Sequence, residues 1–322
     1  MNDSKIKYIS CSIDDNYQEQ FFVFLTSLFE NNSKKEFHIF ILHETLGVEF
    51  KTKIDFFFKV KSTFTYSLIQ LRDSLLDAAL VFGHVSRATY FRLLLPKVIP
   101  NYVNEILYLD VDIIINKNIN KLLEISVSDY SHLGVINLGI DKAYKVNLGL
   151  LNTSTYFNAG VMMINLAWWR NESIYERSLD FIKNNSEKII LWDQDVLNVV
   201  LENNWKELPF KYNAQEQIFR EDMRNEYPVR NFLDSYYNPT IIHYTGGGHS
   251  KPWFKECRHA LKNEYIYYYY KSRRFQVKRE KWLYLFGRDI KLNHLSVLFV
   301  LLQRMNRKLT YFFYKQKINF FA

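Results

Sequence analysis

The sequence contains few cysteines, no pattern typical of a signal peptide and no long apolar run. Only Cys11 and Cys257 are present, which excludes a disulfide framework and is typical of a reducing compartment. Residues 1–5 lead directly into a strand-like run and lack the charged-then-apolar layout of a secretory signal. The longest apolar stretches, such as residues 297–302, are too short to span a bilayer. With neither internal repeats nor a low-complexity linker, we expect a globular, cytoplasmic protein.

Positive charge is concentrated at one end of the chain. The 322 residues include 42 Lys and Arg against 34 Asp and Glu, a net charge of +8. Residues 265–322 hold 13 basic and two acidic side chains, so this tail carries +11 and residues 1–264 carry −3. The tail also holds 16 aromatic residues. This change in composition predicts a domain boundary near residue 264, with domains at 1–264 and 265–322.

Strand-like apolar runs alternate with helical patterns before residue 264. The strands are expected at 6–13, 37–42, 63–69, 106–115, 132–137, 160–165 and 241–243, and the helices at 17–28, 86–95, 168–183 and 193–201. This alternation predicts an α/β fold with an open, mainly parallel central sheet covered on both faces. Residues 207–239 are poorly patterned and are expected to form a long loop. In such sheets, ligands bind beyond the carboxyl ends of the strands.

Two aspartates close one of these apolar runs. Asp110 and Asp112 follow residues 106–109, and side chains two apart in a strand point to the same face. Two like charges in apolar surroundings cost free energy unless a cation lies between them. The pattern therefore predicts a divalent metal site lined by oxygen, with room for phosphate oxygens. The alternative is that one aspartate caps the strand and the other is solvated.

Six motifs along residues 5–255 resemble the family 8 retaining glycosyltransferases, especially the bacterial lipopolysaccharide α-galactosyl- and α-glucosyltransferases. The motifs are Asp14–Tyr17, Thr89–Leu93, Leu107–Asp112, Tyr156–Val161, Trp192–Asn198, and His243–Tyr244 followed by Lys251–Trp253. The resemblance implies a GT-A (Rossmann-like) fold and a UDP-hexose donor. It also implies Mn²⁺, or Mg²⁺, held by Asp110, Asp112 and His243. Such an ion stabilises the negative charge that develops on a leaving diphosphate.

The same resemblance implies the residues that bind the donor. These are Asp14, Asn16, Tyr17, Arg92, Asn158, Ala159, Gly246 and Lys251. Tyr17 offers a stacking face for the base and Asp14 an acceptor for the uracil imide, although Asp and Asn also cap helices. The glycines at 246–248 let backbone N–H groups approach phosphate, whose charge Lys251 can neutralise.

Two of the donor residues have an equally simple structural interpretation. Arg92 offers a planar fork for phosphate or sugar oxygens, or is a solvated arginine on a helix face. Asn158 donates to a hydroxyl of the donor sugar, or is a turn residue before Ala159. An acidic residue that holds the donor sugar in the family has no direct counterpart, so Asn137 or Asp141 takes that role.

Asp193 and Gln194 are the expected catalytic residues. In the family pattern the aspartate binds hydroxyls of the donor sugar, and the glutamine lies near the anomeric carbon. An uncharged amide oxygen is a poor nucleophile, so a covalent intermediate through Gln194 is disfavoured. Front-face attack by the acceptor hydroxyl and double displacement both retain the configuration, and the sequence leaves both open.

The basic, aromatic tail predicts amphipathic helices that lie on an anionic membrane surface. The alternative is an ordinary helical subdomain with an aromatic core. Nucleic-acid binding is not expected, because no nucleic-acid motif accompanies this composition. We therefore place the protein peripherally on the cytoplasmic face of a bacterial inner membrane.

The expected function is a metal-dependent, retaining hexosyltransferase. It moves galactose or glucose from UDP-galactose or UDP-glucose to a lipopolysaccharide or lipooligosaccharide core, which is a lipid-linked acceptor. The alternatives are transfer to another polysaccharide or glycoprotein, a silent nucleotide-sugar-binding membrane adaptor, and a metal-dependent phosphohydrolase. Intact metal and catalytic residues argue against the silent adaptor. A phosphohydrolase would need an activated water or a nucleophile, and no third carboxylate is obviously placed to provide it.

Overall fold

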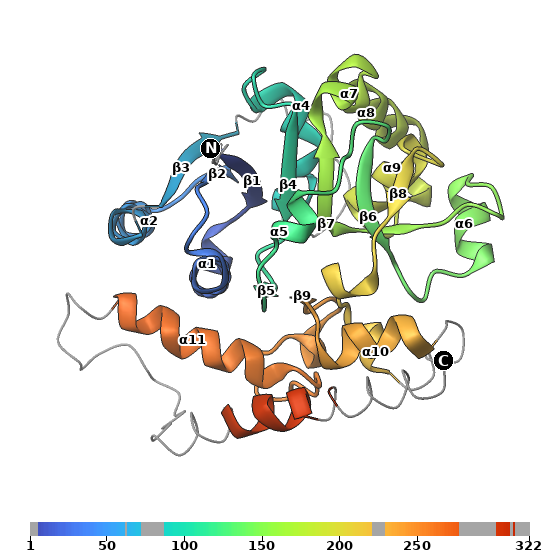
Figure 1. Cartoon of the computed structure of the whole chain (residues 1–322). Helices are drawn as coiled ribbons and strands as arrows, with labels where there is room; N and C mark the ends of the chain where they lie inside the picture. The colour runs from blue at the N-terminus through green and yellow to red at the C-terminus, as the bar shows by residue number, and fades with distance from the viewer. Residues whose placement is uncertain are drawn as a thin grey trace.

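The computed structural model describes residues 6–61, 63–71, 87–220, 229–276, 301–309 and 312. Its centre is a seven-stranded sheet (Figure 1). In spatial order the strands are β3 (Phe64–Gln70), β2 (Phe37–His43), β1 (Lys7–Ser12), β4 (Glu105–Leu109), β7 (Phe157–Asn165), β6 (His132–Ile136) and β8 (Trp205–Glu207). Only β7 runs antiparallel to its neighbours, β4 and β6. The prediction of a mainly parallel α/β sheet is confirmed.

Alternating side chains of the central strands supply two separate cores. Leu107 and Leu109 of β4 pack in the core under α1 (Gln18–Asn32) and α2 (Val48–Val60). Ile106 and Tyr108 point to the opposite face and pack in the second core, with Trp169. That face is covered by η2 (Arg87–Leu94), α4 (Leu95–Val98), α7 (Leu166–Asn171), α8 (Ile174–Asn185) and α9 (Trp192–Val200). Both faces are therefore buried, as expected for a doubly covered sheet.

A small second sheet lies beside the main one. It pairs β5 (Ile113–Ile115) antiparallel with β9 (Ile241–His243). The expected continuous strand at 106–115 is therefore wrong: β4 and β5 belong to different sheets, and the chain bends between them at Asp110–Asp112. The remaining short elements are η1 (Asp15–Tyr17), α5 (Asn120–Leu123), α6 (Lys142–Leu148), η3 (Ser186–Lys188), η4 (Phe210–Tyr212), η5 (Glu216–Phe219) and η7 (Gly248–Ser250).

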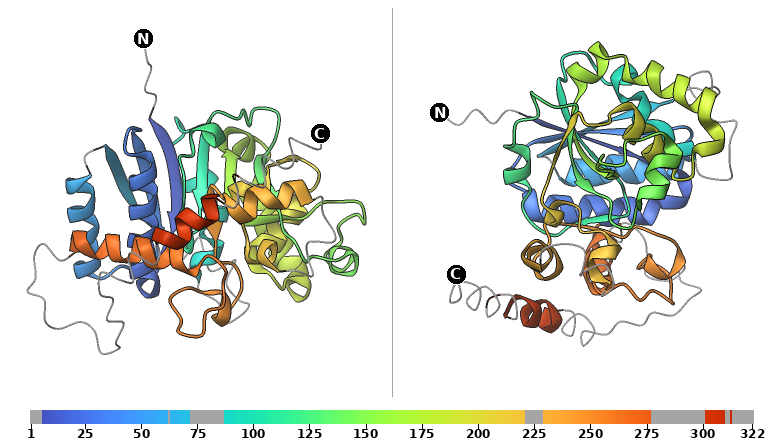
Figure 2. Two further views of the ribbon diagram at one scale, coloured as in Figure 1. Left: turned by 60° about the horizontal axis from the view of Figure 1, so that its bottom comes forward. Right: turned by 90° about the vertical axis from the view of Figure 1, so that its right-hand side faces the viewer.

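The C-terminal helices form a layer on one side of the sheet domain (Figure 2). This layer contains α10 (Val229–Tyr237), α11 (Lys262–Gln276) and a helical segment at 301–309. Tyr265 and Tyr268 of α11 are buried with Val23 of α1 and Ile114 of β5, and the Tyr268 hydroxyl lies 2.7 Å from Asn31 Nδ2. The predicted boundary at residue 264 falls inside α11, whose tyrosines join the core of the preceding residues.

Several sequence predictions differ from the structure. The single helix expected at 168–183 is two helices, because Ser173 adopts a left-handed backbone with φ of 51° between α7 and α8. Helix α2 was not predicted, and the supposed loop at 207–239 contains η4, η5 and α10. The start of the helix expected at 86–95 and most of the tail, including 277–300, lie outside the described residues. Among the helices that are described, none combines the length and apolar character needed to cross a bilayer.

Candidate active site

Three predicted metal ligands converge where the two sheets meet. Asp110 follows β4, Asp112 precedes β5, and His243 ends β9 opposite Ile113. One ligand atom from each lies within 4.8 Å of the others. His243 Nε2 is 3.2 Å from Asp112 Oδ1 and 3.7 Å from Asp110 Oδ2. The two carboxylates thus share a site because the chain bends there, and not because they alternate along one strand.

Gly160 makes room for this cluster. It lies in β7 beside the end of β4, and its carbonyl accepts a 2.9 Å hydrogen bond from the Asp110 backbone N–H. A Cβ at this position would lie 2.2 Å from His243 Cε1 and 2.6 Å from Asp110 Oδ2. Only glycine lets the strand pass this close to both ligands.

A divalent cation fits the donor set of the cluster. Asp112 Oδ1 is buried without a hydrogen-bond partner among the described residues, which is costly unless a cation or proton is close. Two carboxylates and one imidazole are ligands that Mn²⁺ accepts. Burial would raise the pKa of Asp112, but Lys251 and His243 outweigh it, and the pKa lies well below its usual range. Asp112 is therefore an anion ready to bind a metal.

Lys251 lies directly beside the cluster. Its Nζ is 2.5 Å from Asp112 Oδ2 and 2.6 Å from the Tyr244 carbonyl. Gly246, in the loop before it, has a left-handed φ of 83°, and a Cβ there would lie 2.9 Å from Glu216 Oε2. Ser250 donates a hydrogen bond to the same carboxylate. The glycine loop is thus held by Glu216, a residue that the sequence did not reveal.

Arg92 is buried between two carboxylates, so the interpretation as a solvated arginine is wrong. Its Nη2 lies 2.8 Å from Asp110 Oδ1 and its Nε lies 2.7 Å from Asp193 Oδ2. The guanidinium also stacks 4.5 Å over the Tyr108 ring and donates to the Ala159 carbonyl. Burial would lower the pKa of Arg92, but the two aspartates outweigh it and raise the pKa. In this structure Arg92 therefore links Asp110, a predicted metal ligand, to Asp193.

Asp193 and Gln194 lie in the first turn of helix α9, beside Arg92. Asp193 is 2% exposed, and burial raises the pKa of its carboxyl to about 7 although Arg92 opposes the change. Gln194 Oε1 accepts hydrogen bonds from the Ala159 backbone N–H at 3.1 Å and from Asn158 Nδ2 at 3.0 Å. The structure therefore brings four predicted site residues, Asp193, Gln194, Asn158 and Ala159, into one group.

Asp195 holds the start of α9 in place, a role that the sequence did not reveal. Its buried carboxylate accepts hydrogen bonds from the backbone N–H groups of Ile190 and Leu191, at 2.8 and 2.6 Å, and from the hydroxyls of Tyr144 and Tyr156. These bonds offset the left-handed backbone of Trp192, with φ of 51°, which is unfavourable for a residue with a Cβ.

The predicted nucleotide residues lie at the carboxyl end of β1. Asp14 Oδ1 accepts a 2.8 Å hydrogen bond from the Asn16 backbone N–H and so caps η1, as the structural interpretation expected. The half-buried Tyr17 ring lies 5.9 Å from the Trp253 ring, edge to face. Burial raises the pKa of Tyr17, with smaller effects from Lys251 and Asp112. Tyr17 is therefore within electrostatic range of the metal cluster.

Of the two candidates for the missing acidic residue, Asp141 has a local partner. Its carboxylate accepts a 2.7 Å hydrogen bond from the Tyr144 backbone N–H and caps the N-terminus of α6. The Asn137 backbone N–H donates to the Tyr156 carbonyl at 2.8 Å.

Comparisons with known proteins agree with this geometry. The family model described as "Glycosyl transferase family 8" matches residues 8–257. General stress protein A of Bacillus subtilis (strain 168) is 26% identical over 83% of this chain and 94% of its own length. A lipopolysaccharide 1,2-glucosyltransferase of Escherichia coli is 29% identical over 78% of this chain and 74% of its own. The crystal structure of galactosyltransferase LgtC with donor and acceptor sugar analogues superposes with a TM-score of 0.73 at 22% identity, covering 82% of this chain and 95% of that one.

Proposed function

Because the chain belongs to glycosyl transferase family 8 and is therefore a retaining hexosyltransferase, we propose that it transfers galactose or glucose from a UDP-sugar to a lipopolysaccharide or lipooligosaccharide core. The observation that carries the donor chemistry is the cluster of Asp110, Asp112 and His243 with its unpartnered Asp112 oxygen. The name of the Escherichia coli relative supports the acceptor. Transfer to another polysaccharide or glycoprotein is the alternative that an acceptor panel would detect.

In this proposal the three ligands hold Mn²⁺ or Mg²⁺. The bound ion would neutralise the charge that develops on the leaving diphosphate. Lys251 already lies beside Asp112 and would add its positive charge to the same diphosphate. Tyr17 would stack on the uracil base, Asp14 would accept a hydrogen bond from its imide, and the backbone at Gly246 would approach the phosphates.

The remaining residues would hold the hexose. Asp193 would accept hydrogen bonds from sugar hydroxyls, and Arg92 keeps its carboxylate in place. The Gln194 side chain is held by Ala159 and Asn158. Its uncharged amide would then be a fixed dipole near the anomeric carbon and a poor nucleophile. We therefore favour front-face attack, in which the acceptor hydroxyl enters beside the departing diphosphate and passes its proton to a diphosphate oxygen.

An isosteric change of one ligand tests the metal. Asp112→Asn should reduce Mn²⁺-stimulated hydrolysis of a UDP-hexose at least 100-fold, because the amide cannot replace an anionic ligand. A panel of UDP-sugars identifies the donor in the parent protein. Asp129→Asn, at an exposed position just before β6, is the matched control and should behave as the parent. Parental activity in Asp112→Asn would refute the metal assignment.

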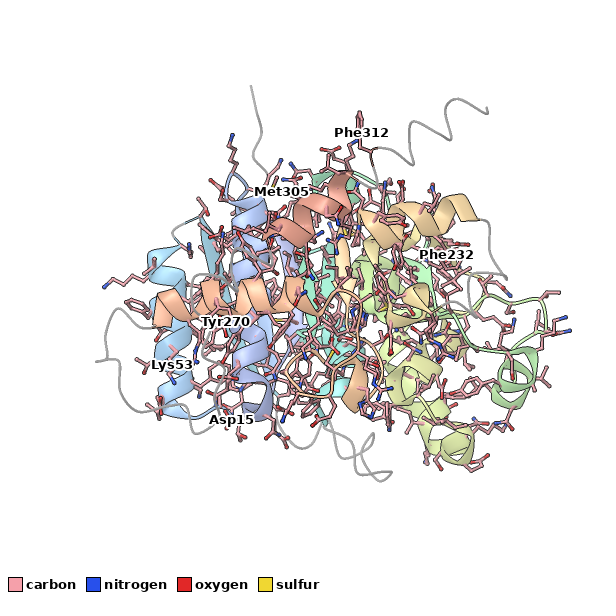
Figure 3. The ribbon with its side chains drawn as sticks, turned by 90° about the horizontal axis from the view of Figure 1, so that it is seen from below. Asp15, Lys53, Phe232, Tyr270, Met305 and Phe312 are labelled. Carbon is pink, nitrogen blue, oxygen red and sulfur yellow. The ribbon has the colours of Figure 1, made fainter. Side chains whose placement is uncertain are left out.

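We also infer that the C-terminal region attaches the enzyme peripherally to an anionic membrane on the cytoplasmic side. On the 301–309 helix and at residue 312, five apolar side chains follow a helical stripe and are 40–59% exposed: Leu301, Leu302, Met305, Leu309 and Phe312. Figure 3 labels Met305 on the 301–309 helix and Phe312 beyond the end of that helix. Arg304 and Arg307, in contrast, face Glu264 of α11. The net charge of +11 in residues 265–322 supports attraction to anionic headgroups.

Charge substitutions in the stripe test this inference. Leu302→Asp with Met305→Asp should weaken binding to phosphatidylglycerol vesicles at least tenfold and leave UDP-hexose hydrolysis unchanged. Val146→Asp with Leu151→Asp introduces the same charges at equally exposed apolar positions elsewhere and should retain vesicle binding. If the Leu302 and Met305 variant binds the vesicles as the parent does, the membrane proposal is wrong.

A further inference from the structure

A buried chain of side-chain amides connects the metal cluster to the catalytic glutamine. It begins at His243, whose Nδ1 lies 3.0 Å from Asn213 Oδ1. Asn213 Nδ2 donates to Asn158 Oδ1 at 2.8 Å, and Asn158 Nδ2 donates to Gln194 Oε1 at 3.0 Å. Asn213 is fully buried in the stretch after η4 that the sequence left unassigned.

Two backbone groups fix the direction of every hydrogen bond in this chain. A backbone N–H can only donate, so the Gly160 N–H at 3.1 Å makes Asn158 Oδ1 an acceptor. The Ala159 N–H makes Gln194 Oε1 an acceptor in the same way. Asn158 Nδ2 is then the donor to Gln194, and Asn213 must use its own Nδ2 toward Asn158 Oδ1.

The direction of the chain also determines the tautomer of His243. Because Asn213 Nδ2 donates to Asn158, it is Asn213 Oδ1 that faces the imidazole of His243. This oxygen can only accept a hydrogen bond, so His243 Nδ1 must carry the proton. A neutral ring then carries its lone pair on Nε2, the atom that faces Asp110 and Asp112. This lone pair is what a metal ion needs, and the ring presents it toward the two carboxylates.

We propose that Asn213 is a positioning residue with two arms. One arm holds His243 in the Nδ1–H tautomer and presents Nε2 to the metal, and the other arm holds Asn158 against Gln194 at the donor sugar. The inference rests on the proposed metal-dependent transfer, which it deepens by coupling metal affinity to donor geometry through one side chain. Partners that orient a histidine ligand in this way typically change metal affinity or activity 10- to 100-fold when removed.

The first test removes both arms. Asn213→Leu has a similar volume and no hydrogen bonds, so Mn²⁺ affinity measured by electron paramagnetic resonance without donor should fall at least tenfold. In metal-free protein, at a pH where titration of the same signals shows the ring to be neutral, the ¹⁵N NMR signals of His243 should move away from the Nδ1–H tautomer. Asn32→Leu is the matched control, because Asn32 is a buried amide that bonds to Leu28 and Ile119 away from the site. It should lose stability without losing Mn²⁺ affinity.

The second test separates the arms and serves if Asn213→Leu fails to fold. Asn213→Asp keeps an acceptor for His243 Nδ1–H but places an oxygen opposite Asn158 Oδ1. Mn²⁺ affinity should stay within about threefold of the parent, while KM for the UDP-hexose should rise at least tenfold. The metal-free NMR signals should keep the Nδ1–H tautomer.

The outcomes distinguish this inference from the function on which it rests. If the parent binds no Mn²⁺, the proposed function fails, whereas the metal-free tautomer still tests Asn213 directly. Suppose that the parent binds Mn²⁺. If Asn213→Leu then has the same Mn²⁺ affinity as the parent, or the same Mn²⁺ affinity as the control Asn32→Leu, the positioning role is wrong. An unchanged His243 tautomer in Asn213→Leu would overturn it as well.

Discussion

Replacing Gly160 by alanine is expected to weaken metal binding strongly while the fold is retained. The new Cβ would overlap His243 Cε1 at 2.2 Å and Asp110 Oδ2 at 2.6 Å, so at least one ligand must move. Mn²⁺ affinity should fall at least 100-fold, because displacing one of the three ligands has about the same effect as replacing that ligand by a residue that cannot bind the ion. Gly47→Ala is the control, because nothing lies within 4 Å of its Cβ position and its φ of −59° suits alanine. Parental Mn²⁺ affinity in Gly160→Ala would mean that the cluster is not the metal site.

His132 gives the protein a predictable loss of stability in acid. The ring is fully buried and stacked on Trp205, and burial lowers its pKa from 6.5 to about 3. Below pH 6.5 the unfolded chain therefore binds a proton at His132, whereas the folded chain does not bind it until about pH 3. The free energy of unfolding consequently falls as the pH falls through this range. At about 1.4 kcal/mol per pH unit, the loss from pH 8 to pH 5 is about 2 kcal/mol.

His132→Phe should remove this contribution. The phenyl ring can keep the stacking on Trp205, and the Ser131 hydroxyl still has the Asn204 carbonyl as a partner at 2.5 Å. Urea unfolding at pH 8 and pH 5 measures the difference between the two free energies. The variant should lose about 2 kcal/mol less than the parent, and an identical loss would show that His132 does not cause the acid sensitivity.

At the scale of single residues, the sequence predicted the residues that belong to recognisable motifs. It missed the residues whose role depends on contacts with distant parts of the chain. Asp110, Asp112 and His243 were placed together correctly. Asn213 is an amide in an unpatterned segment, and nothing in its neighbours along the chain indicates that it meets His243. The buried position of Arg92 between two aspartates was likewise missed, because its partners come from β4 and α9.

Among the elements, α6 allows the two roles of Asp141 to be separated. As a cap, the carboxylate satisfies the Tyr144 backbone N–H, so Asp141→Ala should destabilise α6 by about 1 kcal/mol and speed amide exchange there. Asp141→Asn should preserve the cap, because asparagine is an equally good N-cap residue. If both variants instead raise KM for the donor while only the alanine variant affects α6, Asp141 also holds the donor sugar.

The elements with clear periodicity were predicted, and those set by local backbone or tertiary packing were not. The apolar strands at 37–43 and 241–243 agree closely with the predicted ranges. The break between α7 and α8 depends on a left-handed serine, a conformation that no residue pattern announces. The β4–β5 bend is set by pairing of β5 with β9, which lies more than a hundred residues later in the chain.

At the scale of the whole molecule, Glu264 connects the C-terminal helix to the rest of the enzyme. Its side chain is 3% exposed and pairs with Arg304 at 2.9 Å and Arg307 at 2.7 Å. Arg304→Ala with Arg307→Ala would leave a buried carboxylate without a counter-charge, at a cost of about 3 kcal/mol, so residues 301–309 should undock and let water reach Glu264.

Limited proteolysis of the 301–309 segment measures this undocking, because cleavage follows the open population. The double variant should be cut much faster than the parent, and adding Glu264→Gln should restore part of the resistance. Lys308→Ala removes an exposed cation from the same helix and should be cut at the parental rate. Equal cleavage of all these variants would mean that the ion pairs do not hold the helix.

The change in composition at residue 264 did not reveal this arrangement. Charge and aromatic content rise there, but the first tyrosines of the tail fill a core shared with α1 and β5. Composition averages over a segment and does not record which side chains face inward. The predicted tail thus begins with a helix that belongs to the packing of the main body.

The pairing of β5 with β9 has a consequence for biosynthesis. Asp112 leaves the ribosome 131 residues before His243. At translation rates of roughly 5–20 residues per second, the nascent chain carries the two aspartates without His243 for on the order of ten seconds. If the proposed metal site is correct, all three ligands are available together only after nearly the whole catalytic portion has been made.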